Sequence, residues 1–229
     1  ADNGFSLLIT LDCGINAIDK VEYAAAKGVD VIICDHHLPE AEIPRAVAVL
    51  DPKREDCRYP FDDLSGCGVG FKFVQAYSQR YGVPFESLVP LLDLLVVSIA
   101  SDLVTMVGEN RILAHFGLKQ LNENPCRVLL AMVSLSNLEP GHITVDDIVF
   151  KIGPRINAAG RMEHAELAVQ LFLSDDPAQA ARLAQTLCRL NRERQSTESV
   201  IYRDAVAQLR RGTCPDAIVL AGEGWHQGV

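Results

Sequence analysis

The sequence predicts an α/β protein: a parallel sheet flanked by helices, followed by a helical region and a long connecting helix. In the first fifty residues, short apolar runs alternate with a helical pattern at steps of about 20 residues, the spacing of a parallel β-α-β unit. From Gly66 onward, apolar residues instead recur at helical spacing. The chain has 229 residues, of which 48% are hydrophobic, so it can bury a sizeable core.

Three strands are expected over residues 7–11, 31–34 and 46–50, because these runs are apolar at successive positions. Strands of this kind fit a parallel sheet that helices cover on both faces. Between the first two runs, residues 17–27 show helical periodicity, and Gly28 is a plausible helix end.

The remainder is predicted to be mostly helical, with expected helices over residues 68–81, 86–99, 111–122, 127–135 and 165–173. Pro177 then marks the start of a helix expected over residues 178–211. The middle of this helix is polar, which suits a helix that bridges two domains better than one that fills a core. A strand-like run follows at residues 217–221.

The net charge of −9 is unevenly distributed: residues 1–150 hold 11 Lys and Arg against 21 Asp and Glu, and residues 151–229 hold 10 against 9. This asymmetry suits a metal site joined to a phosphate-contacting region, but on charge alone an ordinary acidic surface is the better interpretation. No apolar run approaches the roughly 18 to 20 residues of a membrane span. No signal peptide opens the chain, and none of the seven cysteines forms a CxxC pair. We therefore expect a cytoplasmic protein with reduced thiols and no membrane association.

Carboxylates and imidazoles follow two neighbouring strands of the expected sheet. Asp12 and Asp35 each stand at the carboxyl end of a strand, and His36 and His37 follow Asp35 directly. Ligands bind at this edge of open parallel sheets, and a mixed carboxylate and imidazole set favours Mn2+ or similar ions. The pattern predicts a metal site, with turn residues at a strand end as the alternative. Asp102 follows a long apolar helix and, taken alone, is better interpreted as a cap-like loop residue than as a ligand.

Residues 153–161, Gly-Pro-Arg-Ile-Asn-Ala-Ala-Gly-Arg, are expected to form an arginine-bearing loop. Its glycines permit close backbone approach, and Arg155, Asn157 and Arg161 offer guanidinium and amide groups suited to phosphate oxygens. Residues 65–70, Ser-Gly-Cys-Gly-Val-Gly, lack the Lys-Ser/Thr of a P-loop. Tight helix packing therefore explains these glycines better than an anion site at a helix N-terminus.

Several of these segments together resemble the motifs of the DHH phosphoesterase superfamily. Residues 9–15 (Ile-Thr-Leu-Asp-Cys-Gly-Ile), 35–37 (Asp-His-His) and 101–102 (Ser-Asp) are similar to its second, third and fourth motifs. Residues 153–162 and 190–195 are similar to segments of its RecJ group of single-strand-specific exonucleases, and residues 225–229 resemble the start of the DHH-associated domain. The first motif, an upstream Asp-x-Asp pair, has no counterpart in the eleven residues before Asp12. The resemblance therefore implies an internal fragment, which by itself is expected to be inactive.

The resemblance also implies a role for each candidate residue. Asp12 would bridge two Mn2+ ions, with Mg2+ as a possible substitute, and His36 and Asp102 would be further ligands. His37 would reach the substrate phosphate, and Asp35 would orient the histidine pair. The expected catalytic set is thus Asp12, Asp35, His36, His37 and Asp102. The residues expected to contact the backbone of single-stranded DNA are Arg155, Asn157 and Arg161.

The implied organisation is a DHH domain at 1–152 that lacks its first strand and motif, the arginine-bearing loop and connecting helix at 153–211, and the start of a truncated DHH-associated domain at 212–229. The implied function is metal-dependent 5′-to-3′ hydrolysis of single-stranded DNA in repair and recombination. A DHH phosphodiesterase acting on cyclic dinucleotides or short oligonucleotides is an alternative that residues 153–211 disfavour, because a small substrate requires no such segment. A non-catalytic DHH scaffold is a second alternative, disfavoured because Asp12, His36 and Asp102 are all present.

Overall fold

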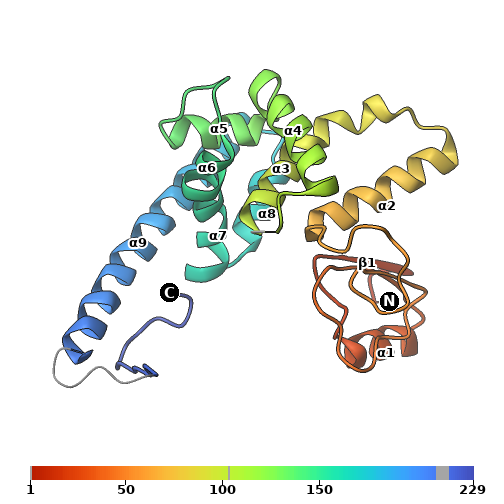
Figure 1. Ribbon diagram of the computed structural model, residues 1–229, viewed down its shortest axis with the longest axis horizontal. Helices are drawn as coiled ribbons and strands as arrows, with labels where there is room; N and C mark the ends of the chain where they lie inside the picture. Colours follow the sequence, from red (N-terminus) through yellow and green to blue (C-terminus); the bar gives the residue numbers. More distant parts are fainter. Residues whose placement is uncertain (1, 103, 210–216) are drawn as a thin grey trace. The chain divides into compact units, whose positions relative to one another are not determined.

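A computed structural model of the chain describes residues 2–102, 104–209 and 217–229 (Figure 1). These residues divide into two compact units. The first unit consists of the described residues up to 126 together with 141–145, and the second consists of 127–140 and the described residues from 146 onward.

The first unit contains a three-stranded parallel sheet in the order β1 (Leu7–Leu11), β2 (Asp30–Cys34) and β3 (Ala48–Leu50). The register pairs Leu11 with Cys34, and Cys34 with Leu50. The three strands therefore end at the same level, and the residue that follows each strand lies in one row along the carboxyl edge of the sheet. This arrangement confirms the predicted α/β fold with a parallel sheet.

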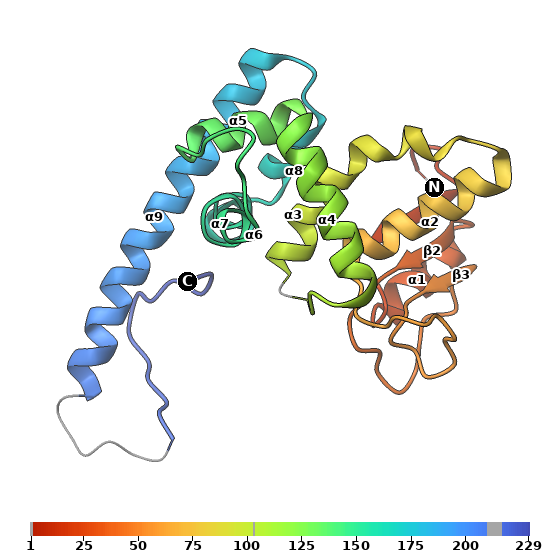
Figure 2. The ribbon, with the colours of Figure 1, turned by 45° about the horizontal axis from the view of Figure 1, so that its top comes forward.

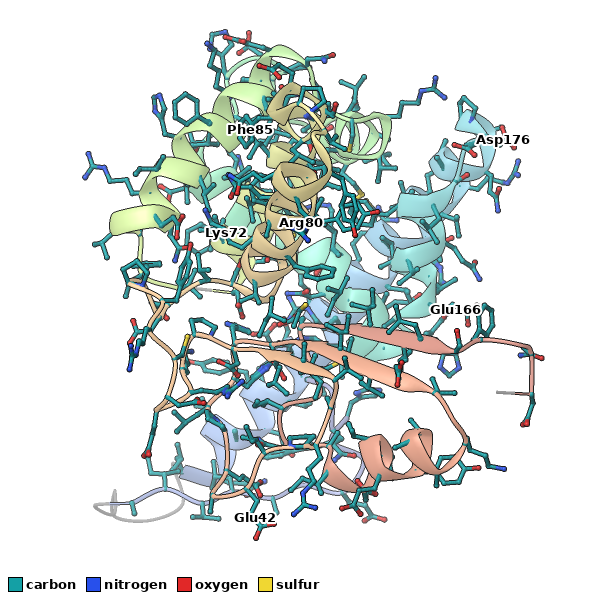
Figure 3. The ribbon with its side chains drawn as sticks, turned by 90° about the vertical axis from the view of Figure 1, so that its right-hand side faces the viewer. Glu42, Lys72, Arg80, Phe85, Glu166 and Asp176 are labelled. Carbon is teal, nitrogen blue, oxygen red and sulfur yellow. The ribbon has the colours of Figure 1, made fainter. Side chains whose placement is uncertain are left out.

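Helices α1 (Ile18–Ala26) and α2 (Gly66–Tyr81) lie on opposite faces of this sheet (Figure 3, where Lys72 and Arg80 mark α2). The core between α1 and the sheet is built on Val21, Val31 and Ile33. Burial of these β-branched side chains supplies much of the free energy that holds α1 against β2.

Strand β1 differs from the prediction that all three strands are covered. Leu8 and Leu11 are 49% and 58% exposed, whereas Ile33 of β2 is fully buried. The reason is position: in the described sheet β1 pairs on one side only, with β2. Helix α1 packs on β2, the central strand of the described sheet, and leaves much of β1 uncovered.

The helical part of the first unit begins with two short 3-10 turns, η1 (Phe85–Ser87) and η2 (Val89–Leu91), before α3 (Leu92–Ser101). The prediction of one helix over 86–99 was therefore too long at its start, because Pro90 has no N–H to give to a helical ladder. Helix α4 (Gly108–Glu123) packs closely against α3. At their contact a Cβ on Gly117 would lie 2.5 Å from the carbonyl oxygen of Leu92.

The second unit is helical, with α5 (Arg127–Leu135), η3 (Ile148–Ile152, a π-helical turn that follows the short α6, Val145–Asp147), α7 (Gly153–Met162), α8 (Glu166–Leu173) and α9 (Pro177–Leu209) (Figure 2). Helices α5, α7 and α8 all pack on α9. The buried residues of α9 run from Ala180 to Asn191, so only its first half contributes to the core of this unit.

Two expectations for the second unit were wrong. Residues 153–161 form a helix, α7, rather than a loop, because Pro154 suits a first helical turn and Ala158 and Ala159 are buried in the packing. Residues 217–221 contain no strand in the part of the chain that the structure describes. The expected end of the long helix at residues 210–211, and residues 212–216 of the third expected segment, lie outside the described residues. The expected segment boundaries stay a prediction.

Among the described helices, none is long and apolar enough to cross a lipid bilayer. Cys13, Cys34, Cys57, Cys67 and Cys188 are free cysteines.

Candidate metal centre

The carboxyl edge of the sheet carries a row of three aspartates. Asp12, Asp35 and Asp51 each follow directly on one of the three strands. The N–H of Asp12 donates to the carbonyl of Cys34 at 2.9 Å, and the N–H of Asp35 donates to the carbonyl of Leu50 at 3.0 Å. The parallel ladder thus continues into this row and fixes the backbone there, at the edge where ligands bind in open α/β sheets.

Asp12 adopts a backbone conformation that is uncommon for a residue with a side chain, with φ of 64°. Residues held in this left-handed region cost on the order of 1 kcal/mol or more and gather at functional sites. The strained turn directs the carboxylate of Asp12 across the sheet edge to His36 of the next strand end.

His36 lies between two carboxylates. Its Nε2 atom is 3.1 Å from Oδ1 of Asp12 and 3.2 Å from Oδ2 of Asp102, and its side chain is 7% exposed. Neither approach has hydrogen-bond geometry, so Nε2 is buried without a hydrogen-bond partner. A single ring nitrogen can donate only one proton, whereas a cation can bind one imidazole and two carboxylates at once. This donor set fits a divalent transition-metal ion.

Asp102 reaches the centre from a different element. It follows α3, and its N–H donates to the carbonyl of Ser98 at 3.0 Å, which fixes its backbone at the helix end. The interpretation of Asp102 as a mere loop residue, which the sequence alone favoured, does not account for its contact with His36.

Asp35 ties two loops together from a buried position, being 1% exposed. One carboxylate oxygen accepts from the N–H of Ile15 at 2.9 Å, and the other accepts from the N–H of His36 at 2.8 Å and from Nδ1 of His37 at 2.7 Å. Burial alone would raise the pKa of Asp35, but these hydrogen bonds outweigh it and hold the pKa below its ordinary value. Asp35 therefore fixes the loop after β1 relative to the loop after β2.

The side chain of His37 is exposed and lies beside the candidate metal ligands Asp12 and His36. Its hydrogen bond to Asp35 raises the pKa of the imidazole, which favours the protonated form, and its side chain is 58% exposed. The ring lies edge-on to that of His36, with centroids 4.7 Å apart. The ligand atoms of Asp12, His36 and His37 all lie within 4.8 Å of one another.

The electrostatics of Asp12 favour a bound cation. Desolvation raises the pKa of its carboxyl, the nearby His36 opposes that rise, and the negative charge of Asp102 adds to it. Two carboxylates directed at one point repel each other unless a positive charge lies between them, and a metal ion supplies that charge.

The three residues expected to contact DNA lie on α7 in the second unit. Asn157 and Arg161 are exposed and one helical turn apart, so they share a face of the helix. Arg155 is two positions from Asn157 and so points to another side, where its guanidinium donates to the carbonyl of Lys151. Arg161 approaches the carbonyl of Gly228 at 3.5 Å.

Sequence reasoning missed two residues next to this centre. Asp51 follows the third strand and could have been found by the rule that selected Asp12 and Asp35. It is 3% exposed, and one of its oxygens accepts from the N–H of Lys53 while the other has no hydrogen-bond partner. Gly66, at the start of α2, contacts Asp12; nothing in the sequence pattern indicates that contact.

The carboxyl edge of the parallel sheet carries Asp12 and an Asp-His-His triplet, and the end of α3 brings Asp102 to the same histidine. These residues define an α/β protein with a candidate metal centre of carboxylate and imidazole groups. Comparison with known proteins agrees: residues 3–99 match the family model described as "DHH family, N-terminal domain".

Over its whole length the chain is similar to RecJ exonucleases. It is 39% identical to the single-stranded-DNA-specific exonuclease RecJ of Bacillus subtilis, covering all of this chain and 28% of that protein. It is 32% identical to RecJ of Escherichia coli, covering 99% of this chain and 42% of that protein. The chain thus spans less than half the length of these curated relatives.

Comparison with solved structures also shows similarity to RecJ exonucleases. A crystal structure of exonuclease RecJ bound to manganese superposes with a TM-score of 0.84 at 31% identity, covering 97% of this chain and 55% of that chain. RecJ from Thermus thermophilus in complex with Mn2+ also gives a TM-score of 0.84, at 32% identity, covering 97% of this chain and 33% of that one.

Proposed function

We propose that this chain forms the metal-binding core of a metal-dependent exonuclease that hydrolyses single-stranded DNA in the 5′-to-3′ direction, in repair and recombination. The observation that carries the proposal is the position of His36 Nε2 between Asp12 and Asp102, at the sheet edge of a chain similar to RecJ exonucleases. Cytoplasmic location is part of the proposal.

The residues that would hold the metal are Asp12, His36 and Asp102, with Mn2+ as the expected ion and Mg2+ as a substitute. Support comes from the buried, unpartnered Nε2 of His36 and from relatives solved with Mn2+ and with Mg2+. When bound, such ions activate water and neutralise the charge that develops on the phosphoryl group.

Asp35 would position other residues of the centre, and His37 would supply positive charge to the substrate. Asp35 would orient His37 by accepting a hydrogen bond from Nδ1–H, and it holds the two strand-end loops in place through the N–H groups of Ile15 and His36. Because the same hydrogen bond favours the protonated imidazole, His37 would offer positive charge to a phosphate of the substrate.

The second unit would contribute contacts to the DNA backbone. The proposed residues are Arg155, Asn157 and Arg161, whose planar groups suit phosphate oxygens. The shared face of Asn157 and Arg161 on α7 supports these two more directly than Arg155.

The test uses the full-length protein with Mn2+ and three substrates: 5′-labelled single-stranded DNA, the matching duplex, and a cyclic dinucleotide. Release of mononucleotides from single strands alone supports the proposal. Hydrolysis of the cyclic dinucleotide alone would establish the phosphodiesterase alternative, and no hydrolysis of any of them would favour a scaffold. The control variant His36→Ala removes the central ligand and should lower turnover by more than about 100-fold.

A further inference from the structure

Gly66, the first residue of α2, lies directly against the carboxylate of Asp12. A Cβ atom on Gly66 would be 2.0 Å from Oδ1 of Asp12, 2.3 Å from its Cγ and 2.6 Å from its Cβ. Real Cβ atoms essentially never come within 3.0 Å of another group. No residue with a side chain therefore fits at position 66 unless Asp12 moves.

Backbone conformation does not explain a glycine here. Gly66 is helical and is not one of the glycines with positive φ, so alanine could adopt the same backbone and would favour the helix. Gly70, one turn later, gives the contrast: a Cβ there would meet only the end of the Leu11 side chain, at 3.3 Å. Glycine is required at position 66 because the side chain of Asp12 fills the space beside it.

Both backbones at this contact are held in place. The N–H of Asp12 donates a hydrogen bond to the carbonyl of Cys34, which continues the parallel ladder. At the start of α2, the hydroxyl of Ser65 accepts from the N–H of Gly68 at 3.1 Å and from the hydroxyl of Ser98 on α3 at 3.0 Å. A methyl group at position 66 would therefore displace the Asp12 side chain, which is 61% exposed and can turn toward solvent.

We propose that Gly66 is a positioning residue, which leaves the space that keeps the Asp12 carboxylate beside Nε2 of His36 and so prepares the Asp12, His36 and Asp102 set for a divalent cation. This inference rests on the proposed function, since it concerns the same centre. A larger residue at position 66 leaves His36 and Asp102 in place and removes one carboxylate from the set.

The first test measures Mn2+ binding to the full-length protein by electron paramagnetic resonance of the free ion. Gly66→Ala is compared with Gly70→Ala, a matched control on the same helix. Gly66→Ala should weaken Mn2+ binding by about tenfold or more and raise the Mn2+ concentration needed for half-maximal exonuclease activity. Gly70→Ala should bind Mn2+ as the wild type does. Unchanged Mn2+ affinity in Gly66→Ala would overturn the inference.

The second test asks whether the collision is with Asp12. Asp12→Gly removes the three atoms nearest to a methyl at position 66, and glycine suits the φ of 64° at position 12. In metal-free protein, Gly66→Ala should lower the unfolding temperature in the wild-type background but not in the Asp12→Gly background. An equal fall in unfolding temperature in both backgrounds would show that Asp12 is not the group displaced, and it would overturn the inference.

The outcomes separate this inference from the proposed function. A wild-type protein that binds Mn2+ but cleaves no single-stranded DNA contradicts the proposed function, and the binding comparison between Gly66→Ala and Gly70→Ala still decides the role of Gly66. A wild-type protein that cleaves single strands, with Gly66→Ala retaining full Mn2+ affinity, contradicts only the role of Gly66.

Discussion

Asp35 and Asp51 occupy equivalent positions after neighbouring strands, yet folding moves their pKa values in opposite directions. Hydrogen bonds from Ile15, His36 and His37 lower the pKa of Asp35 against the effect of burial. Burial raises the pKa of Asp51, and the negative charge of Asp35 adds to the rise, which Lys53 and His36 only partly oppose. The ionised carboxylate therefore stabilises the fold at position 35 and costs stability at position 51.

We predict that Asp35→Asn lowers the free energy of unfolding of the metal-free protein by about 2 kcal/mol at pH 7, because an amide replaces a buried charged acceptor. A carboxylate with a lowered pKa stabilises above its ordinary value of 3.8 and loses that effect as pH falls through the folded value. The difference in unfolding free energy between wild type and variant should be constant near neutral pH and should disappear in acid. Denaturant unfolding across a pH series measures it.

Asp51→Asn is the matched control and should have the opposite effect. The amide oxygen can still accept from the N–H of Lys53, while the cost of a buried charge is removed. Because the folded pKa is raised, wild-type stability falls as pH rises from 3.8 through the folded value, so the variant gains stability at neutral pH and the gain disappears in acid. If Asp51→Asn lowered the free energy of unfolding as much as Asp35→Asn does, this account would be contradicted.

At the scale of elements, the start of α2 connects the sheet edge to α3. Ser65 is fully buried and caps α2 through the N–H of Gly68, and its hydroxyl also accepts from Ser98. Since α3 ends at Asp102 and α2 begins at Gly66, these hydrogen bonds help to set the distance between two carboxylates that approach the same histidine.

We predict that Ser65→Ala lowers the free energy of unfolding by about 1 to 2 kcal/mol, the cost of losing an N-cap. Ser98→Ala removes only the bond between the two hydroxyls and should cost less. Chemical denaturation of both variants gives the comparison. Equal losses would show that the cap to Gly68 contributes little.

Helix α7 gives a second prediction at this scale. Arg161→Ala should weaken binding of single-stranded DNA and reduce the slope of log affinity against log salt by about 0.7, the effect of one lost phosphate contact. Arg54→Ala is a suitable control, because that guanidinium is bound to Asp56 at 2.9 Å and 2.6 Å within the first unit. A slope that is unchanged in Arg161→Ala would remove Arg161 from the proposed DNA contacts.

At the scale of the molecule, the candidate metal ligands and the residues of α7 that are proposed to contact DNA belong to different units. Asp12, His36, His37 and Asp102 all belong to the first unit, and Arg155, Asn157 and Arg161 belong to the second. Residues 1–150 have a charge balance of −10, from 11 cationic against 21 acidic residues, so a bound cation would also lower the repulsion between this part and a polyanion.

We predict that the 229-residue chain alone binds one Mn2+ ion weakly and shows no measurable nuclease activity. The described centre brings together only Asp12, His36, His37 and Asp102 as candidate ligands, and two-metal hydrolysis requires ligands for a second ion. Titration calorimetry gives the stoichiometry, and a single-strand cleavage assay gives the activity. Two tightly bound ions with robust cleavage would show that this set suffices.

Local patterns in the sequence are enough to predict the parallel strands and the residues that follow the first two of them, because periodicity and the residues next to a strand end are local properties. These local patterns place Asp12, Asp35, His36 and His37 at one edge of the sheet, as the structure has them. The glycine and proline content of residues 153–161 predicts a loop, but burial of Ala158 and Ala159 stabilises a helix there.

The contacts of Asp102 with His36 and of Gly66 with Asp12 arise from tertiary packing. Both contacts depend on how α2 and α3 pack on the sheet, and residues 12, 66 and 102 are far apart in the chain. Packing between distant segments is set by the fit of many side chains at once, so no local pattern contains it.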